Sequence, residues 1–267
     1  MHHRLLVFDF DGVLADSFHD SFLTALNSYL QMQPALHLPL DQLIAPPQAV
    51  IRFENEHPDV KKRFRALMPF GNRAEDYFVI LHLMDRHPEI VLQSESEFLE
   101  YKVALGDTGL DRYQKIFYRQ RMQRQQSDPA AWAALLPPFK GIVKSVRDLS
   151  RRFTLAIATS KDRLSVSLLL KQYKLASLFN EDYILDKDFG QNKRGHLVRL
   201  QEITDTASHD MHFIDDKLLH LRSVQDLGVH LYLAAWGYNT AREREQAAND
   251  GFQVLELDRL RYIGAKR

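Results

Sequence analysis

Residues 5–17 read LLVFDFDGVLADS, and the rest of the chain is interpreted outward from this stretch. An apolar run of strand length, residues 5–8, ends in two carboxylates one residue apart, Asp9 and Asp11, and Gly12 follows at once. Alternate residues of a strand lie on the same side, so the two acids can face one site. Burying such charges costs free energy unless they are neutralised or used. The stretch therefore predicts a carboxylate site at the end of a central strand, where open α/β sheets bind their ligands.

The composition is that of an ordinary globular protein. The chain has 267 residues, of which 45% are apolar and 26% charged, and its 35 basic residues balance 35 acidic ones. This balance gives no reason to expect a nucleic-acid or membrane-surface partner. There are no cysteines, which excludes disulfides, thiolate metal sites and cysteine nucleophiles. The start of the chain does not read as a signal peptide and no apolar run is long enough for a membrane span, so we expect a cytoplasmic protein.

The middle of the chain is predicted to be helical throughout. Apolar residues recur at helical spacing over 18–30, 73–84 and 95–125, and a proline-rich stretch separates the first two. Gly106 and Gly109 are expected to interrupt the third. No convincing strand is found between 18 and 138.

An α/β rhythm begins after a linker at 137–141. Short apolar strands are expected to alternate with helices, the strands at 153–158, 182–185, 211–214 and 229–234, and the helices at 142–150, 164–173, 192–203 and 217–227. This alternation predicts an α/β fold with a doubly wound, mainly parallel sheet. Because the strand at 5–8 has no partner before about residue 153, the helical block must be an insertion. We expect a core domain of 1–18 and 139–267 and an inserted helical domain of 19–138.

Three of the predicted strands end in polar residues. These are Asp9 with Asp11, Thr159 with Ser160, and Asp215 with Asp216. Parallel strands place their carboxyl ends at one edge, so these groups are expected to converge. Four carboxylates repel each other unless a cation is bound, and all-oxygen ligands favour Mg²⁺. Lys193, near the start of a helix, could supply a fixed positive charge there.

These features resemble the haloacid dehalogenase superfamily, chiefly its phosphatases of the phosphoglycolate phosphatase and β-phosphoglucomutase type. Residues 9–17 are similar to that family's first signature, D-x-D-G-[TV]-L-x-D-S. The second signature, a strand ending in Thr or Ser, matches residues 158–160, and the fourth, an apolar strand ending in paired acids, matches residues 213–216. The third, a lysine, fits Lys193 best, although Lys187 is an alternative. The insert corresponds in position to the family's helical C1 cap.

The resemblance implies Mg²⁺-dependent hydrolysis of a small phosphorylated metabolite. Asp9 would be the nucleophile that forms an aspartyl-phosphate, and Asp11 the general acid and base. Phosphoryl oxygens would be bound by Thr159, Ser160 and Lys193. The metal would be held by Asp9, Asp11, Asp215 and Asp216. Asp11 also argues against dehalogenation, because the superfamily's dehalogenases lack an acid at that position.

Several alternatives remain open at the level of sequence. A sugar-phosphate mutase would use the same four motifs, and a non-catalytic binding or regulatory protein could retain the fold. Arg73 could grip an anionic substrate, or it could simply precede a helix whose first turn carries Glu75 and Asp76. The oligomeric state is also left open between a monomer and a homodimer.

Overall fold

Strand β1 forms the centre of a six-stranded sheet in the computed structural model, which describes residues 4–264 except 34, 72 and 191. The strand order is β3-β2-β1-β4-β5-β6, and every neighbouring pair is parallel. The strands are β1 (Leu5–Phe8), β2 (Thr154–Ala158), β3 (Ile184–Leu185), β4 (Met211–Asp215), β5 (His230–Ala234) and β6 (Gln253–Leu255). In register, Leu5 pairs with Thr154 of β2 on one side and Met211 of β4 on the other. The predicted doubly wound parallel sheet is confirmed.

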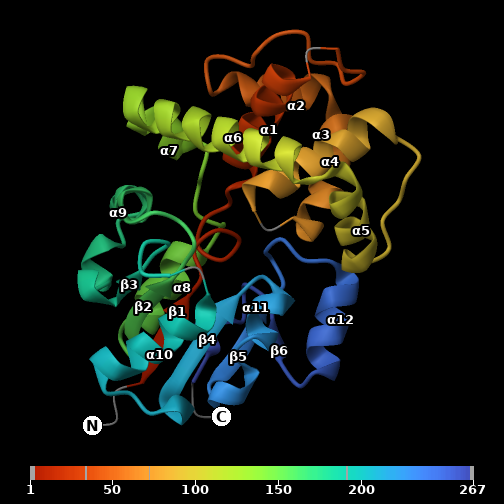
Figure 1. Ribbon diagram of the computed structural model, residues 1–267. Helices are drawn as coiled ribbons and strands as arrows, with labels where there is room; N and C mark the ends of the chain where they lie inside the picture. Colours follow the sequence, from red (N-terminus) through yellow and green to blue (C-terminus); the bar gives the residue numbers. More distant parts are fainter. Residues whose placement is uncertain (1–3, 34, 72, 191, 265–267) are drawn as a thin grey trace. The chain divides into compact units, whose positions relative to one another are not determined.

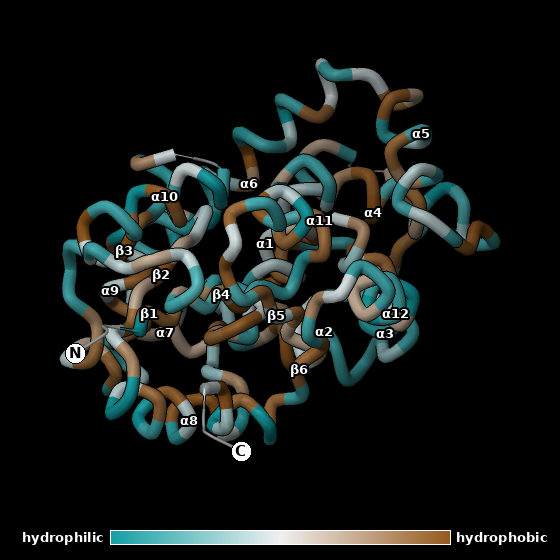
Figure 2. Tube along the Cα trace, turned by 90° about the horizontal axis from the view of Figure 1, so that it is seen from below, coloured by the Kyte–Doolittle hydropathy of each residue, from teal (hydrophilic) through white to brown (hydrophobic). Residues whose placement is uncertain are grey.

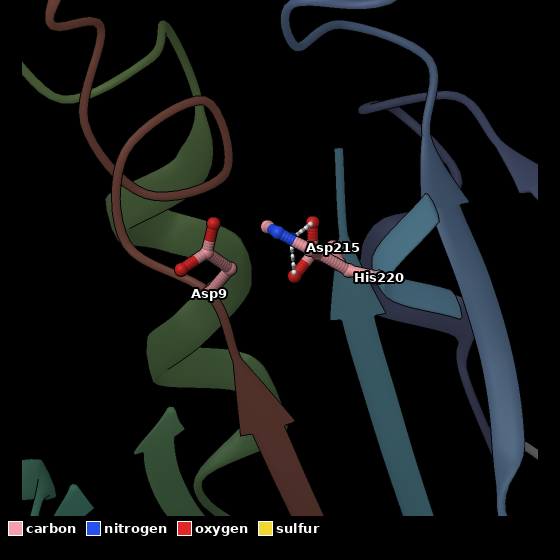
Figure 3. Close-up of side chains that lie close together, drawn as sticks. All are labelled: Asp9, Asp215 and His220. Atoms are coloured by element: carbon pink, nitrogen blue, oxygen red, sulfur yellow. Dashed lines mark hydrogen bonds and ion pairs between the residues drawn. The ribbon is translucent and has the colours of Figure 1, made fainter. Parts of the chain in front are cut away.

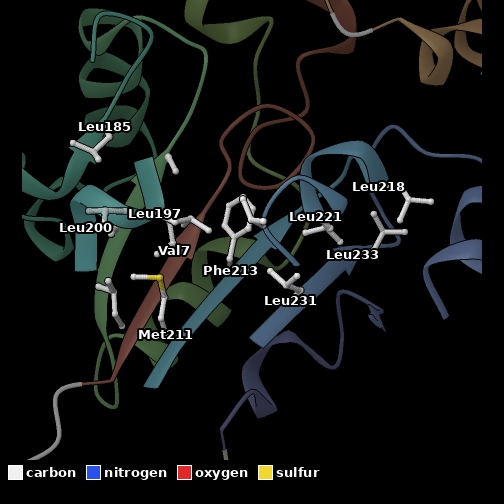
Figure 4. Close-up of a cluster of buried hydrophobic side chains, with 14 of the residues drawn as sticks. Val7, Leu185, Leu197, Leu200, Met211, Phe213, Leu218, Leu221, Leu231 and Leu233 are labelled. Atoms are coloured by element: carbon white, nitrogen blue, oxygen red, sulfur yellow. The ribbon is translucent and has the colours of Figure 1, made fainter. Parts of the chain in front are cut away.

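Apolar side chains on both faces hold helices against this sheet. Figure 4 shows Val7 and Phe213 of the central strands next to side chains from the covering helices, among them Leu197 and Leu221. Seen from below, α8 (Ile142–Leu149) lies on one side of the strands, with α10 (Lys193–Thr204) and α11 (Leu218–Arg222) on the other (Figure 2). The sheet is therefore buried on both faces, as expected for parallel strands joined by helical crossovers.

The sheet-containing part also holds several short helices and 3₁₀ turns. They are α8 (Ile142–Leu149), α9 (Arg163–Gln172), α10 (Lys193–Thr204), α11 (Leu218–Arg222) and α12 (Ala241–Asn249), with 3₁₀ turns at Ala176–Leu178, Glu181–Tyr183, Ser208–Asp210, Gln225–Leu227 and Leu260–Tyr262. The helix predicted at 217–227 is too long, because the chain changes to a 3₁₀ turn before Gly228, which has a positive φ of 73°. Helix α12 and β6 were not predicted; α12 is polar and buries only Ala247, so it has little apolar periodicity.

The inserted part is helical over its described residues. Its elements are α1 (Phe18–Met32), α2 (Ala49–Glu56), α3 (Pro58–Leu67), a 3₁₀ turn (Met68–Phe70), α4 (Ala74–Arg86), α5 (Glu95–Leu105), α6 (Asp107–Ser127) and α7 (Pro129–Ala134). Aromatic rings such as Phe22, Phe64 and Tyr77 pack together in its core. Gly106 separates α5 from α6, as predicted, but Gly109 lies inside α6. The space around Gly109 is open, so a glycine costs that helix only its intrinsic propensity.

The chain forms two units, Met1–Asp16 with Pro137–Arg267, and Ser17–Leu136 (Figure 1). We call the first the sheet unit and the second the helical unit. Over the part of the chain that the structure describes, no helix is both long and apolar enough to cross a bilayer.

Candidate active site

Two buried carboxylates from neighbouring strands share one lysine at the carboxyl edge of the sheet. Asp9 follows β1 and Asp215 ends β4, and their exposed fractions are 6% and 0%. The Nζ atom of Lys193, at the start of α10, lies 2.7 Å from Asp9 Oδ1 and 3.1 Å from Asp215 Oδ2. The same ammonium group donates to the carbonyl oxygen of Ala158, at the end of β2, at 2.7 Å. One cation therefore joins the ends of three adjacent strands.

The electrostatics of this group follow from its burial. Burial opposes ionisation of Asp215, but the charges of His220 and Lys193, with hydrogen bonds to that carboxylate, outweigh it and hold the pKa of Asp215 well below its usual range. Burial and the charge of Asp215 raise the pKa of Asp9, although Lys193 opposes the shift. Burial also opposes the charge of Lys193, but Asp215 and Asp9 raise its pKa overall. The lysine is therefore held in its charged form beside the two acids.

His220 completes a group of donor atoms that could hold a metal ion. One atom each from Asp9, Asp215 and His220 lies within 4.8 Å of the others. His220 Nδ1 is 3.0 Å from both oxygens of Asp215. In Figure 3, Asp9 at the end of β1 stands beside Asp215, whose carboxylate faces the ring of His220 from α11.

Asp11 faces a second lysine. Lys161 Nζ donates to both carboxylate oxygens of Asp11, at 3.0 Å and 2.9 Å. The Lys161 side chain is 5% exposed, whereas that of Asp11 is 34% exposed. Asp11 is thus the more accessible of the two acids in the first motif, as a group that exchanges protons with substrate or water needs to be.

Asp216 occupies a different environment from Asp215. Its Oδ2 accepts a hydrogen bond from the backbone N–H of Tyr238 at 2.7 Å, and burial raises its pKa to about 7. A Cβ atom built on Gly12 would lie 2.2 Å from Asp216 Oδ2, and one built on Gly237 would lie 2.3 Å from Asp216 Cβ. Gly12 also has a φ of +83°, which L side chains rarely adopt. Both glycines are therefore required for Asp216 to pack beneath the turn after β1, and its carboxylate is not among the grouped donor atoms described above.

The other predicted site residues differ in their burial and in their contacts. Thr159 follows β2 and is buried, and its Oγ1 accepts from the N–H of Lys161 at 3.1 Å. Ser160 is exposed. Lys187 is half exposed and lies 3.6 Å from Asp188, so Lys193 and not Lys187 contacts the acids. Arg73 is an exposed residue of the helical unit that precedes α4, with its N–H donating to Asp76 at 2.8 Å.

Sequence reasoning missed three contributors to this edge. His220 and Lys161 carried no motif of their own, although each follows a predicted strand end by only a few residues. The third is the loop after β5, where Trp236 Nε1 donates to Val13 O at 3.0 Å and Tyr238 OH to Asp16 Oδ1 at 2.7 Å. The WGYN sequence directly after an apolar strand was the available signal.

Comparison with known families shows which family the chain belongs to. A profile described as haloacid dehalogenase-like hydrolase matches residues 92–234, which is more than half of the chain. The chain belongs to this family. The predicted superfamily membership is confirmed, and the protein is a hydrolase of that family. The matched range includes Asp215 and Lys193 but ends short of Asp9 and Asp11, so the interpretation of the first motif depends on its own residues and geometry.

Solved structures share the fold across almost the whole chain. A putative phosphoglycolate phosphatase from Lactobacillus delbrueckii has a TM-score of 0.65 at 13% identity, covering 98% of each chain. A predicted phosphoglycolate phosphatase from Haemophilus somnus has a TM-score of 0.59, and a haloacid dehalogenase-like hydrolase from Streptococcus pneumoniae one of 0.58, each at 17% identity with 98% of both chains covered. At such identities the likeness concerns the fold. A search of curated proteins finds no match.

Proposed function

We propose that this hydrolase is a Mg²⁺-dependent phosphatase that cleaves a small phosphomonoester through a covalent intermediate on Asp9. The observation that carries the proposal is that Asp9 and Asp215 both pair with Lys193. Asp11 lies two residues beyond Asp9, and its side chain is 34% exposed. The solved structures named as phosphoglycolate phosphatases share the fold and support the same reaction class.

In the first half of the reaction, a carboxylate oxygen of Asp9 attacks phosphorus. The bond from phosphorus to the ester oxygen breaks, and that oxygen takes a proton from Asp11 and leaves as an alcohol. The ammonium group of Lys193 lies 2.7 Å from Asp9 and is therefore close to the phosphoryl oxygens as negative charge spreads over them. Thr159, at the adjoining strand end, offers a hydroxyl for the same oxygens.

In the second half, water attacks the phosphorus of the aspartyl-phosphate. The water gives a proton to the Asp11 carboxylate, the bond between phosphorus and the Asp9 oxygen breaks, and inorganic phosphate leaves. Both aspartates are then ready for another cycle. Lys161 holds the Asp11 carboxylate through two contacts, which fixes its direction between turnovers.

The residues present fit a divalent cation. Asp9, Asp11, Asp215 and Asp216 put four acids at one strand edge, where the buried cations among the described residues are Lys161 and Lys193. A hard cation is the usual partner of such oxygen donors. We propose that Asp9 and Asp215 hold it, with Asp216 bracing the turn beneath Gly12. When bound, Mg²⁺ supplies positive charge that offsets the carboxylates and the phosphoryl group.

We further propose that the helical unit serves as the substrate-selecting cap of this enzyme. The helical unit begins at Ser17, at the end of the first motif, and the chain re-enters the sheet unit at Pro137. Arg73 remains a candidate for binding an anionic substrate there. Arg73→Ala should raise KM while changing kcat little if it does, because the residue would contribute to binding and not to the chemical step.

The proposal is tested by phosphate release across a panel of small phosphomonoesters, with and without Mg²⁺. We expect turnover of at least one substrate that requires Mg²⁺ and stops in Asp9→Asn. Trapping of radiolabelled phosphate on the wild-type protein, and its absence in the variant, would locate the intermediate.

Product analysis separates the remaining alternatives. An isomeric sugar phosphate with little free phosphate would identify a mutase in place of a phosphatase. Absence of any Mg²⁺-dependent turnover across the panel would favour a binding or regulatory protein and would overturn the proposal.

A further inference from the structure

The loop that follows β5 holds the turn that follows β1 through two side chains. The indole Nε1 of Trp236 donates to the carbonyl oxygen of Val13 at 3.0 Å, and the hydroxyl of Tyr238 donates to Asp16 Oδ1 at 2.7 Å. Val13 is fully buried, so its carbonyl oxygen needs a donor from the protein. We call residues 236–238 the clamp.

The clamp is itself anchored to the residue after β4. The backbone N–H of Tyr238 donates to Asp216 Oδ2 at 2.7 Å, and Asn239 Nδ2 donates to the carbonyl oxygen of Asp216 at 3.0 Å. A Cβ atom built on Gly237 would lie 2.5 Å from the carbonyl oxygen of Gly12, so a side chain there would clash with the turn. The clamp therefore contacts the turn along its backbone as well as through its two side chains.

The turn under the clamp is bonded to itself and carries Asp11. The N–H of Ala15 donates to the carbonyl oxygen of Phe10 at 3.0 Å, and the N–H of Gly12 donates to the carbonyl oxygen of Ala15 at 2.9 Å. Asp11 and Ala15 also form an isolated β-bridge. Because these bonds join both sides of the turn, a contact made elsewhere on it bears on the position of the Asp11 carboxylate.

We propose that Trp236 and Tyr238 are positioning residues for Asp11, which they hold at the point from which it protonates the leaving oxygen. The inference rests on the proposed function, which makes Asp11 the general acid, and goes beyond it by assigning the alignment of that acid to a loop outside the four signature motifs. Neither residue acts on the reacting atoms directly. Alignment matters because a misplacement of about 1 Å can cost about 100-fold in rate.

Other contacts could hold the acid without the clamp, and they predict a different result. The N–H of Asp16 donates to the carbonyl oxygen of Pro137 at 2.8 Å, which ties the turn to the segment where the chain re-enters the sheet unit. Lys161 holds the carboxylate of Asp11 itself. If these contacts suffice, loss of the clamp's side-chain hydrogen bonds lowers stability and leaves the reaction unchanged.

The test compares two esters whose leaving oxygens differ in their need for a proton. 4-Nitrophenolate leaves as a stable anion, whereas phenolate is a stronger base and depends more on a general acid. The kcat/KM for 4-nitrophenyl phosphate and for phenyl phosphate is measured with Mg²⁺ in the wild type, Tyr238→Phe and Trp236→Phe. This ratio reports the steps up to departure of the phenol, so hydrolysis of the intermediate, which both esters share, does not enter it.

Both variants should lose about tenfold or more on phenyl phosphate and less than about threefold on 4-nitrophenyl phosphate. Each substitution removes one donor and keeps an aromatic ring, and Tyr238→Phe also keeps the backbone bond to Asp216. Tyr262→Phe is the matched control, because it makes the same change on a tyrosine of the same unit that is 51% exposed, and it should behave like the wild type on both esters. Circular dichroism and melting curves ensure that rates refer to folded protein.

Substitutions of the acceptor give a second measurement. Asp16→Ala should show the same selective loss as Tyr238→Phe, and the double variant should lose little more than either one, because both substitutions remove the same hydrogen bond. Asp16→Asn keeps an acceptor oxygen and should lose less than Asp16→Ala.

The inference and the proposed function fail in distinguishable ways. Equal losses on the two esters, or no loss in folded variants, would overturn the inference and leave the proposed phosphatase activity intact. Additive losses in the double variant would overturn the role of Tyr238, because its hydroxyl would then act through a partner other than Asp16. Failure of the wild type to release phosphate from any phosphomonoester would overturn the proposed function, and the inference with it.

Discussion

Buried acids in the helical unit and in the sheet unit are neutralised in different ways. In the helical unit each one lies next to a different basic residue, with Asp20 next to Arg121, Glu54 next to Lys61, Asp76 next to Lys102 and Asp85 next to Arg86, at 2.5–2.8 Å. At the carboxyl edge of the sheet, Asp9 and Asp215 share Lys193. No two of the four buried acids of the helical unit share a basic residue, although Lys102 also contacts Glu75 and Glu54 also contacts His19. Two buried acids on one lysine leave negative charge that a metal or substrate group can use.

The difference predicts which substitutions damage activity and which damage stability. Where each acid has its own partner, removing the acid should lower the free energy of unfolding. Where acids crowd around one lysine, removing an acid relieves repulsion, so the cost should appear in the reaction.

Asp9→Asn should give the largest effect. Phosphate release should fall by about 10⁴-fold or more, because the amide cannot form the covalent intermediate. The melting temperature should stay within a few degrees of the wild-type value, because one of two mutually repelling acids is gone. Stopped-assay phosphate release and calorimetric melting measure the two quantities. Asp188→Asn, on an exposed acid of the same unit, is the control and should change neither. A large loss of stability in Asp9→Asn would contradict the comparison.

Lys193→Met removes the shared cation instead. Leaving two buried carboxylates without their ammonium group should lower the free energy of unfolding by about 3–5 kcal/mol. Millimolar Mg²⁺ or Mn²⁺ should restore part of that loss, since a divalent cation can take over the neutralisation. Urea unfolding with and without the metal measures both effects.

The control for this substitution is Lys187→Met, whose lysine is half exposed. It should unfold like the wild type in both conditions. A Lys193→Met variant that is as stable as the wild type without metal would show that the acids are not held ionised by this lysine.

Asp85→Ala tests the helical unit. The Asp85 carboxylate accepts from Tyr29 OH at 3.1 Å and from the N–H groups of His37 and Leu38 at 2.5 Å and 3.1 Å, besides pairing with Arg86. Loss of these contacts should cost about 2–3 kcal/mol of stability by leaving buried donors without an acceptor. The kcat per folded molecule should be unchanged. Asp111→Ala, on an exposed face of α6, should cost much less.

Glu54→Gln should give the smallest effect, a loss of stability near neutral pH that disappears in acid. Burial opposes ionisation of Glu54, but hydrogen bonds from His19 and Lys61 outweigh it and lower its pKa. A carboxyl with a lowered pKa stabilises the fold above its unfolded pKa, and this stability is lost as the pH falls through the folded value. Unfolding measured from pH 6 to pH 3 should therefore show a shallower acid limb in Glu54→Gln. If stability falls with pH equally steeply in both proteins, Glu54 does not contribute to unfolding in acid.

The parts of the fold that follow from local pattern could be predicted from sequence. Strands β1, β2 and β4 are apolar runs that end in polar residues, and α10 and α1 carry apolar residues at helical spacing. The elements that were missed have weak local signals. Helix α12 is polar and β6 is only three residues long, so β6 owes its position to pairing with β5, and α12 to its contacts with β6 and α11.

The same distinction applies to the candidate site. Asp9 and Asp215 could be named because a charged residue after a buried strand is costly and therefore conspicuous. The contact of Lys161 with Asp11 joins residues 150 positions apart, and that of His220 with Asp215 depends on how the chain turns into α11. Asp216 was expected to bind metal, a role that stays a prediction, whereas its packing between Gly12 and Gly237 needs three separate segments in place.

The central position of β1 has a consequence for biosynthesis. Both neighbours of β1 lie far along the chain, since Leu5 pairs with Thr154 and Met211. At about 5–20 residues per second, translation leaves this apolar strand without a partner for roughly 7–30 s after it emerges. During that time the helices between Ser17 and Leu136 can already make their contacts with one another. The nucleophile candidate at the end of β1 is thus made well before the strands that flank it, and until they appear the unpaired apolar strand is exposed to aggregation.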